Sequence, residues 1–312
     1  MRRVLVLHIT YEIPRIVNLI AWRRLDFPSL NPVVPYPVLL LVSGTERSLI
    51  IGDLHIGWEA SLAEQGLHIP SQAPKLLERL KTIIKETDST RLIVLGDIKH
   101  TVTKVGLMEW CDIPAFFEAL FEIIREIDVI PGNHDGNLEA LVPRGVNIHA
   151  VSGLTVDHEV GIIHGHAWPK PEILGCNTIV MGHLHPMIAL ADTLGFSTTY
   201  QVWLRATSDG EVLAQNLLKH LGMRSESNVR TTMKEHFNVD LTDPYCIFLP
   251  SFNSLLSGQI LNKAPEELRL GESYTGPLLR FNGIQIRDAD VYLIDGTYLG
   301  KLRALPATGK YT

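Results

Sequence analysis

Five short segments of this chain place aspartate, asparagine and histidine side chains directly after apolar runs. In chain order they are Asp53-Leu54-His55, Gly96-Asp97, Gly132-Asn133-His134-Asp135, His164-Gly165-His166 and Gly182-His183-Leu184-His185. Carboxylate, amide and imidazole groups are ligands for divalent metals, although a single such pair in a chain of 312 residues is more often a turn or a strand end. The five segments together indicate one composite metal centre.

The segments follow stretches that the sequence predicts as β-strands. Four stretches are mostly apolar without alternation, as expected for strands buried on both faces: 91–95, 127–130, 160–163 and 178–181. A β-hairpin is also expected, because 38–42 and 48–52 flank a turn centred on Gly44, and Asp53 then follows the second strand. Functional groups in open α/β sheets gather at the carboxyl ends of strands, so the five segments should meet at one rim.

Two helices are expected to cover the sheet. Between Gln72 and Thr87 the apolar residues recur at helical spacing, with lysine and glutamate on the opposite face. A second helix is expected to begin at Asp112 as its N-cap, with Pro114 in its first turn, and to continue through Ile124.

The spacing within two of the segments is also informative. Alternate side chains of a strand share a face, so Asp53 and His55 can reach one ion together while Leu54 turns toward the core. His183 and His185 have the same relation. A mixture of imidazole and oxygen ligands suits manganese, iron or zinc better than calcium.

The order and residue types of these segments resemble those of the calcineurin-like metallophosphoesterase superfamily, whose motifs read D-x-H, G-D, G-N-H-D, a lone H and G-H-x-H. The similarity spans roughly residues 50–186. Two longer motifs resemble those of a narrower prokaryotic branch, related to the SbcD nuclease and to the ligase-associated phosphoesterase PdeM. They are Gly96-Asp97-Ile98-Lys99-His100 and Gly182-His183-Leu184-His185-Pro186. The resemblance implies a four-layer α/β/β/α sandwich of two mixed sheets flanked by helices.

The resemblance also implies two divalent metal ions and their ligands. Asp53, His55, Asp97 and His185 would hold one ion, and Asp97, Asn133, His164 and His183 the other. Asp97 would then bridge the two ions, which suits a carboxylate because its two oxygens can bind two cations and its charge lessens their repulsion. Manganese is the first expectation for the metal, with iron and zinc as alternatives.

Four further residues receive roles from the same motifs. A hydroxide bridging the two metals would attack phosphorus, and His134 would assist the leaving oxygen. His100 is expected to contact phosphate or to tune His134, and Asp135 to orient His134 or to cap a helix at 137–141. His166 is expected to lie behind the ligands or to contact the substrate. The alternative for each histidine is a hydrogen-bonding role without catalysis.

Residues outside the motifs are expected mainly to support the fold. Trp168, two residues beyond His166, is the tryptophan best placed to line a substrate pocket, whereas core packing is expected for Trp58 and Trp110. The three cysteines have no C-x-x-C spacing, which argues against a zinc or redox motif and fits a reducing cytoplasm. Glu12, Pro14, Arg15 and Asn18 interrupt the apolar start of the chain, so neither a signal peptide nor a membrane anchor is expected there.

Composition and charge limit which domain organisation and which partners are expected. With 46% hydrophobic residues the chain can bury a sizeable core, and one domain is expected. The expected parts are an N-terminal extension of no assigned role, a metallophosphoesterase core, a polar insertion or lid, and C-terminal strands that complete the same domain: 1–33, 34–218, 219–244 and 245–312. The formal charge of −6 provides no global positive field to attract nucleic acid, which argues against a processive nuclease.

The sequence therefore predicts a cytoplasmic, metal-dependent phosphohydrolase that acts as a phosphodiesterase or nuclease. A nucleotide or another small phosphodiester is the alternative substrate to DNA, and a homodimer or a DNA-repair protein is the expected partner, with no membrane. A different class of function is a non-catalytic interaction module, like the retromer subunit that keeps this fold without its metal ligands. The complete ligand set of this chain disfavours that alternative.

Overall fold

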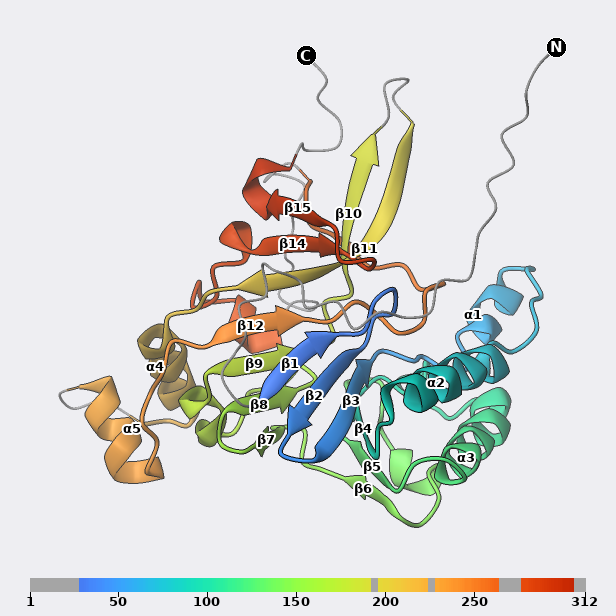
Figure 1. Cartoon of the computed structure of the whole chain (residues 1–312), viewed down its shortest axis with the longest axis horizontal. Coiled ribbons are helices and arrows are strands. Elements are labelled where there is room, and N and C mark those ends of the chain that lie inside the picture. The colour runs from blue at the N-terminus through green and yellow to red at the C-terminus, as the bar shows by residue number, and fades with distance from the viewer. Residues whose placement is uncertain (1–27, 192–195, 224–227, 264–275, 306–312) are drawn as a thin grey trace.

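Two β-sheets pack face to face in this protein (Figure 1). The structure is a computed structural model that describes residues 28–191, 196–223, 228–263 and 276–305. Most of the N-terminal extension expected at 1–33, including the stretch considered as a signal or anchor, lies outside the described residues.

The first sheet has six strands in the order β1-β2-β3-β4-β5-β6. Its strands are β1 (Ser29–Pro32), β2 (Leu39–Ser43), β3 (Glu46–Gly52), β4 (Arg91–Leu95), β5 (Glu126–Val129) and β6 (Val146–Ile148). Pairing is antiparallel from β1 to β3 and parallel from β3 to β6. The predicted hairpin is confirmed as β2 and β3, joined through Gly44 with φ +57°. Strand β1 belongs to the sheet although it falls within the expected N-terminal extension.

The second sheet has nine strands, also with mixed pairing. Its strands are β7 (Leu154–Val156), β8 (Val160–Ile163), β9 (Thr178–Met181), β10 (Pro186–Ala191), β11 (Ser197–Ala206), β12 (Tyr245–Phe248), β13 (Gln259–Ile260), β14 (Asp290–Leu293) and β15 (Tyr298–Lys301). Strands β8, β9 and β12 run parallel to one another, whereas β11 runs antiparallel to β12 and to β14. The C-terminal strands β12 and β14 thus complete this sheet.

Helices flank the two sheets. They are α1 (Glu59–Glu64), α2 (Ala73–Thr87), α3 (Leu107–Phe121), α4 (Gly210–His220), α5 (Val229–Phe237) and α6 (Gly276–Leu279), with short 3₁₀ turns η1 (Leu138–Ala140), η2 (Pro171–Gly175), η3 (Ile286–Asp288) and η4 (Leu302–Ala304). Figure 1 shows α2 and α3 beside the first sheet and α4 beside the second. The four-layer α/β/β/α prediction is confirmed.

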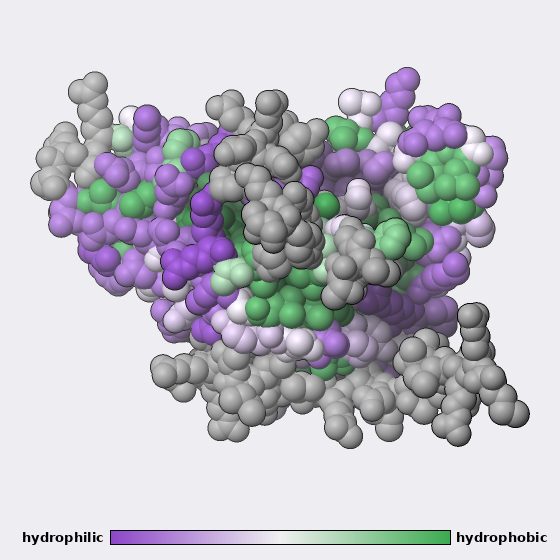
Figure 2. Space-filling view, turned by 90° about the horizontal axis from the view of Figure 1, so that it is seen from above, coloured by the Kyte–Doolittle hydropathy of each residue, from purple (hydrophilic) through white to green (hydrophobic). Residues whose placement is uncertain are grey.

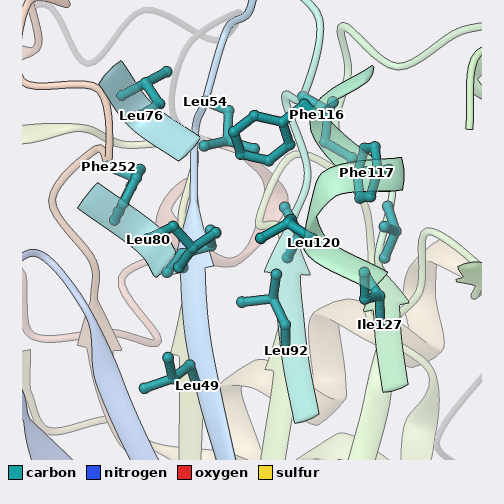
Figure 3. Packing of buried hydrophobic residues seen from close by; sticks show 14 of the residues in the cluster. Leu49, Leu54, Leu76, Leu80, Leu92, Phe116, Phe117, Leu120, Ile127 and Phe252 are labelled. Atoms are coloured by element: carbon teal, nitrogen blue, oxygen red, sulfur yellow. The ribbon is translucent and has the colours of Figure 1, made fainter. Parts of the chain in front are cut away.

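The cores between the layers explain why the strands are apolar throughout. Leu49 and Leu92 pack against helices α2 and α3, where Leu80 and Phe117 meet them (Figure 3). Ile50, which points to the opposite face of β3, belongs instead to the cluster between the two sheets. Each side chain of this size contributes about 1.5 to 3 kcal/mol when fully buried. Strands covered on both faces therefore have no solvent-facing position to break the apolar run.

The second predicted helix begins earlier than expected. Helix α3 starts at Leu107 after Gly106, so Pro114 lies inside the helix and the prediction that Asp112 is the N-cap is wrong. The Glu109 carboxylate accepts the Gly106 backbone N–H at 2.6 Å, which satisfies a donor at the true start of the helix. Asp112 instead accepts a hydrogen bond from the Ser71 hydroxyl at 2.7 Å.

The segment 219–244, expected to be a polar insertion or lid, contains helix α5 in its described part. Met233, Val239 and Leu241 from this segment are buried in the cluster that packs on the second sheet. Within α5 the polar residues Lys234 and Glu235 lie on the exposed face of an amphipathic helix. Its polar composition thus reflects a covering helix.

The molecular surface is mixed in character. Seen from above, hydrophobic residues gather in the middle of the face and hydrophilic residues dominate around them (Figure 2). None of the helices in the described parts of the chain combines the length and the apolar character that crossing a membrane requires.

Candidate metal centre

The polar residues of the D-x-H and H-x-H segments lie in loops just after strands β3 and β9, and not within those strands. Strands β3 and β9 end at Gly52 and Met181, and the prediction that these side chains alternate within a strand is wrong. Asp53 and His55 have φ values of +60° and +43°, and His183 and His185 have +63° and +44°. Such left-handed backbone is uncommon outside glycine and concentrates at functional sites.

In both loops the leucine and the polar residues on either side of it nevertheless point in opposite directions. Leu54 is fully buried in the cluster under helices α2 and α3, and Leu184 is buried in the cluster of the second sheet. The polar residue on either side of each leucine therefore points away from the core. One loop comes from each sheet, so the two sheets present matching Gly-x-Leu-His turns toward each other.

A first group of donor atoms comes from Asp53, His55, Asp97 and His185, with one atom of each within 4.8 Å of the others. His185 Nε2 lies 3.0 Å from Asp53 Oδ1, and His55 Nε2 lies 3.4 Å from Asp97 Oδ2. These are the four residues expected for one metal.

A second group consists of Asp97, His164 and His183, again with one donor atom of each within 4.8 Å. His164 Nε2 lies 3.5 Å from Asp97 Oδ2. Asp97 is common to both groups, as a bridging ligand would be. Asn133, the fourth residue expected here, is exposed in the loop after β5, between Gly132 and His134.

The hydrogen bonds of His164 leave one nitrogen for the centre. Its Nδ1 donates to the backbone carbonyl of Leu95 at 2.7 Å, which leaves Nε2 facing Asp97. Within the described residues, His55 Nε2, His164 Nε2 and Asp53 Oδ2 are buried atoms that make no hydrogen bond. An unpaired buried polar atom costs about 1 to 3 kcal/mol, a cost that a bound cation would remove. The donor set therefore fits two divalent ions.

Two glycines allow the loops to approach this closely. A Cβ atom on Gly132 would lie 2.1 Å from Asp97 Oδ1, and one on Gly96 would lie 2.3 Å from the Gly132 nitrogen. Gly96 also has φ +61°. The glycines in the G-D and G-N-H-D segments thus provide the space in which Asp97 reaches both groups.

The charges of the centre shift the pKa values of its histidines in opposite directions. Burial disfavours the charged form of His164, but Asp97 and Asp53 outweigh burial and raise its pKa to about 9. Burial lowers the pKa of His55 to about 3 and, together with the charge of His164, that of His183 to about 4. Burial opposes ionisation of Asp97, yet His164 and His55 hold its pKa below the usual range. Neutral imidazoles and ionised carboxylates are the forms that bind metals.

His134 lies beside Asp97 with one side of its ring turned away from it. Its Nδ1 contacts the backbone carbonyl of His100, and its backbone N–H donates to Asp97 Oδ1 at 2.9 Å. The Nε2 atom lies 3.9 Å from Asp97 Oδ2 and the side chain is 23% exposed. His134 can therefore present Nε2 to a bound substrate while Nδ1–H remains held.

His100 borders both His55 and His134. Its Nδ1 lies 3.4 Å from His55 Nδ1, and its ring stacks against that of His134 at 5.9 Å between centroids. Burial and the neighbouring His134 lower the pKa of His100. The structure thus brings together all three histidines at this edge of the centre.

Asp135 braces two loops. One of its carboxylate oxygens accepts the N–H groups of Ile98 and Lys99, at 2.9 and 3.3 Å, and the other accepts that of Gly132 at 2.8 Å. Its carboxylate neither contacts the His134 ring nor caps η1, for which Asn137 is the N-cap. Burial raises the pKa of Asp135, and the nearby Asp97 raises it further. Asp135 therefore fixes the loop after β4 to the loop after β5.

Glu109 is a residue that the sequence analysis missed. Its buried carboxylate accepts the backbone N–H groups of His100 and Thr101, at 3.0 and 2.7 Å, and that of Gly106 at 2.6 Å. It also accepts the Thr101 hydroxyl at 2.6 Å. A glutamate at the third position of a helix whose carboxylate accepts the N-cap N–H is one half of a capping box, and this is the signal that could have revealed it.

Ser251 and Asn253, from the loop after β12, support the first metal segment from the C-terminal half of the chain. The Ser251 hydroxyl donates to the carbonyl of Asp53 at 2.8 Å, and the Asn253 side chain donates to that of Leu54 at 3.0 Å. Nothing in their local sequence marks them. Residues 254–258 of the same loop line a groove of about 780 Å³ together with strands β10, β11 and β14.

His166 lies on the side of the centre away from His134. Its ring centroid is 5.1 Å from that of His164 and 6.1 Å from that of His183. Burial lowers its pKa to about 4, and its Nδ1 is a buried atom without a hydrogen bond in the described parts of the chain. Trp168 is half-buried on the same loop, whereas Trp110 is 49% exposed, so core packing is the wrong prediction for Trp110.

The fold and the family of this chain have parallels among known proteins. The fold is similar to that of a crystal structure of Pseudomonas putida nuclease MPE, with a TM-score of 0.51 and 16% sequence identity over 88% of this chain and 96% of that one. At this identity the likeness establishes the fold alone. No curated protein matches the chain. The profile of the calcineurin-like phosphoesterase family matches residues 47–242, which is more than half of the chain. The chain therefore belongs to the calcineurin-like phosphoesterase family.

Proposed function

We propose that this phosphoric ester hydrolase is a phosphodiesterase that acts with two divalent metal ions. Membership of the family supports metal-dependent ester hydrolysis. The observation that carries the proposal is the sharing of Asp97 between two groups of donor atoms. A carboxylate shared in this way is the arrangement expected of a two-metal site.

In this proposal each half of the centre holds one ion. Asp53, His55, Asp97 and His185 bind the first, and Asp97, Asn133, His164 and His183 the second. When bound, the two ions supply hydroxide at neutral pH and offset the charge that develops on the phosphoryl oxygens. We keep manganese as the first metal to test, with iron and zinc as the alternatives that imidazole and carboxylate ligands also suit.

His134 is the proposed proton donor to the leaving oxygen. The carbonyl of His100 fixes the proton on Nδ1, so a proton delivered to the substrate comes from Nε2. A positioned general acid contributes on the order of 10² to 10⁴ in rate. His100 supports this step through that carbonyl, and its partly exposed ring is the proposed contact for phosphate.

The substrate class is a nucleic acid in the first proposal and a nucleotide or other small phosphodiester in the second. The fold likeness to a nuclease favours a nucleic acid, and so do the motifs around Asp97 and His183 that resemble the nuclease-related branch. The formal charge of −6 favours short or unpaired segments over long duplexes, since no global positive field attracts phosphates. We place this activity in the cytoplasm, in a homodimer or beside a DNA-repair protein.

Activity measurements on metal-stripped protein test the proposal. Addition of manganese should restore hydrolysis of an aryl phosphodiester, and Asp97→Asn or His183→Ala should abolish it. His134→Ala should bind metal as the parent protein does and lose at least about a hundredfold in kcat. Unchanged turnover in the Asp97 and His183 variants would refute the two-metal assignment. A panel of phosphomonoester, cyclic nucleotide, and single- and double-stranded DNA then ranks the substrate classes.

A further inference from the structure

An aromatic stack is built on Trp168, which stands on the same loop after β8 as His164 and His166. The Trp168 ring stacks against those of His220 and Phe281, with centroid distances of 5.1 and 6.1 Å and interplanar angles of 20° and 16°. These rings come from the loop after β8, the end of α4 and the residues after α6. Three distant parts of the chain therefore converge on one nearly parallel set of rings.

The outer members of this stack are open to solvent. Phe281 is 45% exposed and His220 is exposed, whereas Trp168 is partly buried against the core of the second sheet. Trp168 thus serves as the base of the stack, and Phe281 is the accessible phenyl ring on one side of it, opposite the exposed imidazole of His220.

A short segment connects the stack to the metal centre. Gly276, the first residue of α6, packs closely against Gly165, which stands between His164 and His166 in the sequence. A Cβ atom on Gly276 would lie only 1.9 Å from the Gly165 carbonyl oxygen. Leu278 and Leu279 of α6 line a small pocket together with His183. Phe281 follows Leu279 by two residues, so the accessible ring lies just beyond a residue that shares a pocket with His183.

The charge of the chain makes this surface important for substrate affinity. A protein with a formal charge of −6 gains little from long-range attraction of phosphates. Stacking of bases on aromatic rings supplies affinity that depends little on sequence. It is available to unpaired bases, because the bases of a duplex already stack on one another.

We propose that Phe281, supported by Trp168, is a stacking site for an unpaired base next to the phosphodiester bond held at the metal centre. This inference rests on the proposed phosphodiesterase function and defines its substrate as single-stranded nucleic acid or a nucleotide ester. The metal centre holds the phosphate, and the stack selects substrates that carry a base.

Matched oligonucleotides test the inference. One is a short single strand of ordinary nucleotides, and the other has the same phosphates but abasic residues throughout. With manganese, the parent protein should cleave the first with a kcat/KM about tenfold higher, a difference typical of one stacked base. Phe281→Leu should remove this preference, chiefly through KM, and Phe281→Trp should retain it. The preference should persist at high salt, because stacking does not depend on charge.

Control variants separate the stack from general effects. Phe196→Leu removes another exposed aromatic ring, which is 71% exposed before β11, and should leave the preference unchanged. Equal cleavage of the two strands by the parent protein, or a preference that survives in Phe281→Leu, would overturn the inference while leaving the phosphodiesterase intact. Absence of manganese-dependent hydrolysis of any phosphodiester would instead overturn the proposed function.

Discussion

The Glu109 carboxylate accepts the backbone N–H of His100 at 3.0 Å, so a buried residue of helix α3 fixes the loop whose carbonyl holds His134. The same carboxylate also accepts the N–H of Gly106. The position of His134, the proposed proton donor, therefore depends on a buried side chain of α3 that is not among the proposed metal ligands.

Replacing Glu109 by glutamine should reduce turnover more than substrate binding. An amide keeps one acceptor oxygen but turns a donor toward one of the N–H groups that the carboxylate accepts, which frees part of the loop at a cost of about 1 to 3 kcal/mol. Displacement of His134 should then lower kcat about tenfold or more, with little change in KM. Steady-state kinetics and metal content provide the measurement.

Glu118→Gln, on the exposed face of the same helix, is the matched control and should behave as the parent protein. A lower melting temperature of Glu109→Gln with unchanged kcat would show that Glu109 supports only the fold.

Metal affinity should rise with pH between about 6.5 and 8.5. The pKa of His164 is raised to about 9 in the metal-free protein, so this imidazole carries a proton at neutral pH that a metal must displace. Each displaced proton should strengthen apparent affinity up to about tenfold per pH unit. Metal titrations at three pH values measure the slope, and phenol red in weak buffer should report released protons. An affinity that is flat across this range would contradict the prediction.

Gly132→Ala should weaken metal binding. Its Cβ would lie 2.1 Å from Asp97 Oδ1, so the bridging carboxylate or the loop must move. Metal content after dialysis should drop and activity should be lost. Gly136→Ala, in the same loop, has nothing closer than 3.7 Å to its new Cβ and is the control. Full metal content in Gly132→Ala would indicate that Asp97 is free to shift.

Asp128→Asn should destabilise the first sheet at neutral pH. The buried carboxylate accepts Arg91 Nε at 2.7 Å and lies 2.5 Å from His149 Nε2. Burial opposes its ionisation, but Arg91 and His149 prevail and lower its pKa. A lowered pKa contributes stability above the unfolded value near 3.9, and this contribution is lost as pH falls through the folded value.

Urea unfolding at pH 7 should show a loss of about 2 kcal/mol or more in Asp128→Asn, shrinking toward pH 3. Glu126→Gln removes an exposed carboxylate 3.7 Å from the same arginine and should cost less than about 1 kcal/mol. Similar losses in the two variants would assign the effect to surface charge.

The sequence was sufficient to predict the strands that precede the motifs, and the convergence of the motifs, because both depend on local patterns. Apolar runs mark β4, β8 and β9, and polar residues after them mark the rim. The backbone of Asp53 and His183 was not predictable in this way, since alternation of faces is common to strands and to the left-handed turns observed.

Contacts between distant residues account for what the sequence did not reveal. Ser251 and Asp53 are 198 positions apart, and the helix start at Gly106 depends on the carboxylate of Glu109 and its partners in the preceding loop. The stack of Trp168 and Phe281 likewise requires the fold to bring its members together. Only Glu109 left a local signature.

Because the matching Gly-x-Leu-His turns come from different sheets, a cation held by Asp53 and His185 would span the seam between the two halves of the protein. Pulling those halves apart would then require breaking coordination bonds as well as the apolar interface. Chelation should accordingly lower the temperature at which the sheets separate, so a melting curve can report occupancy even where no turnover is measured.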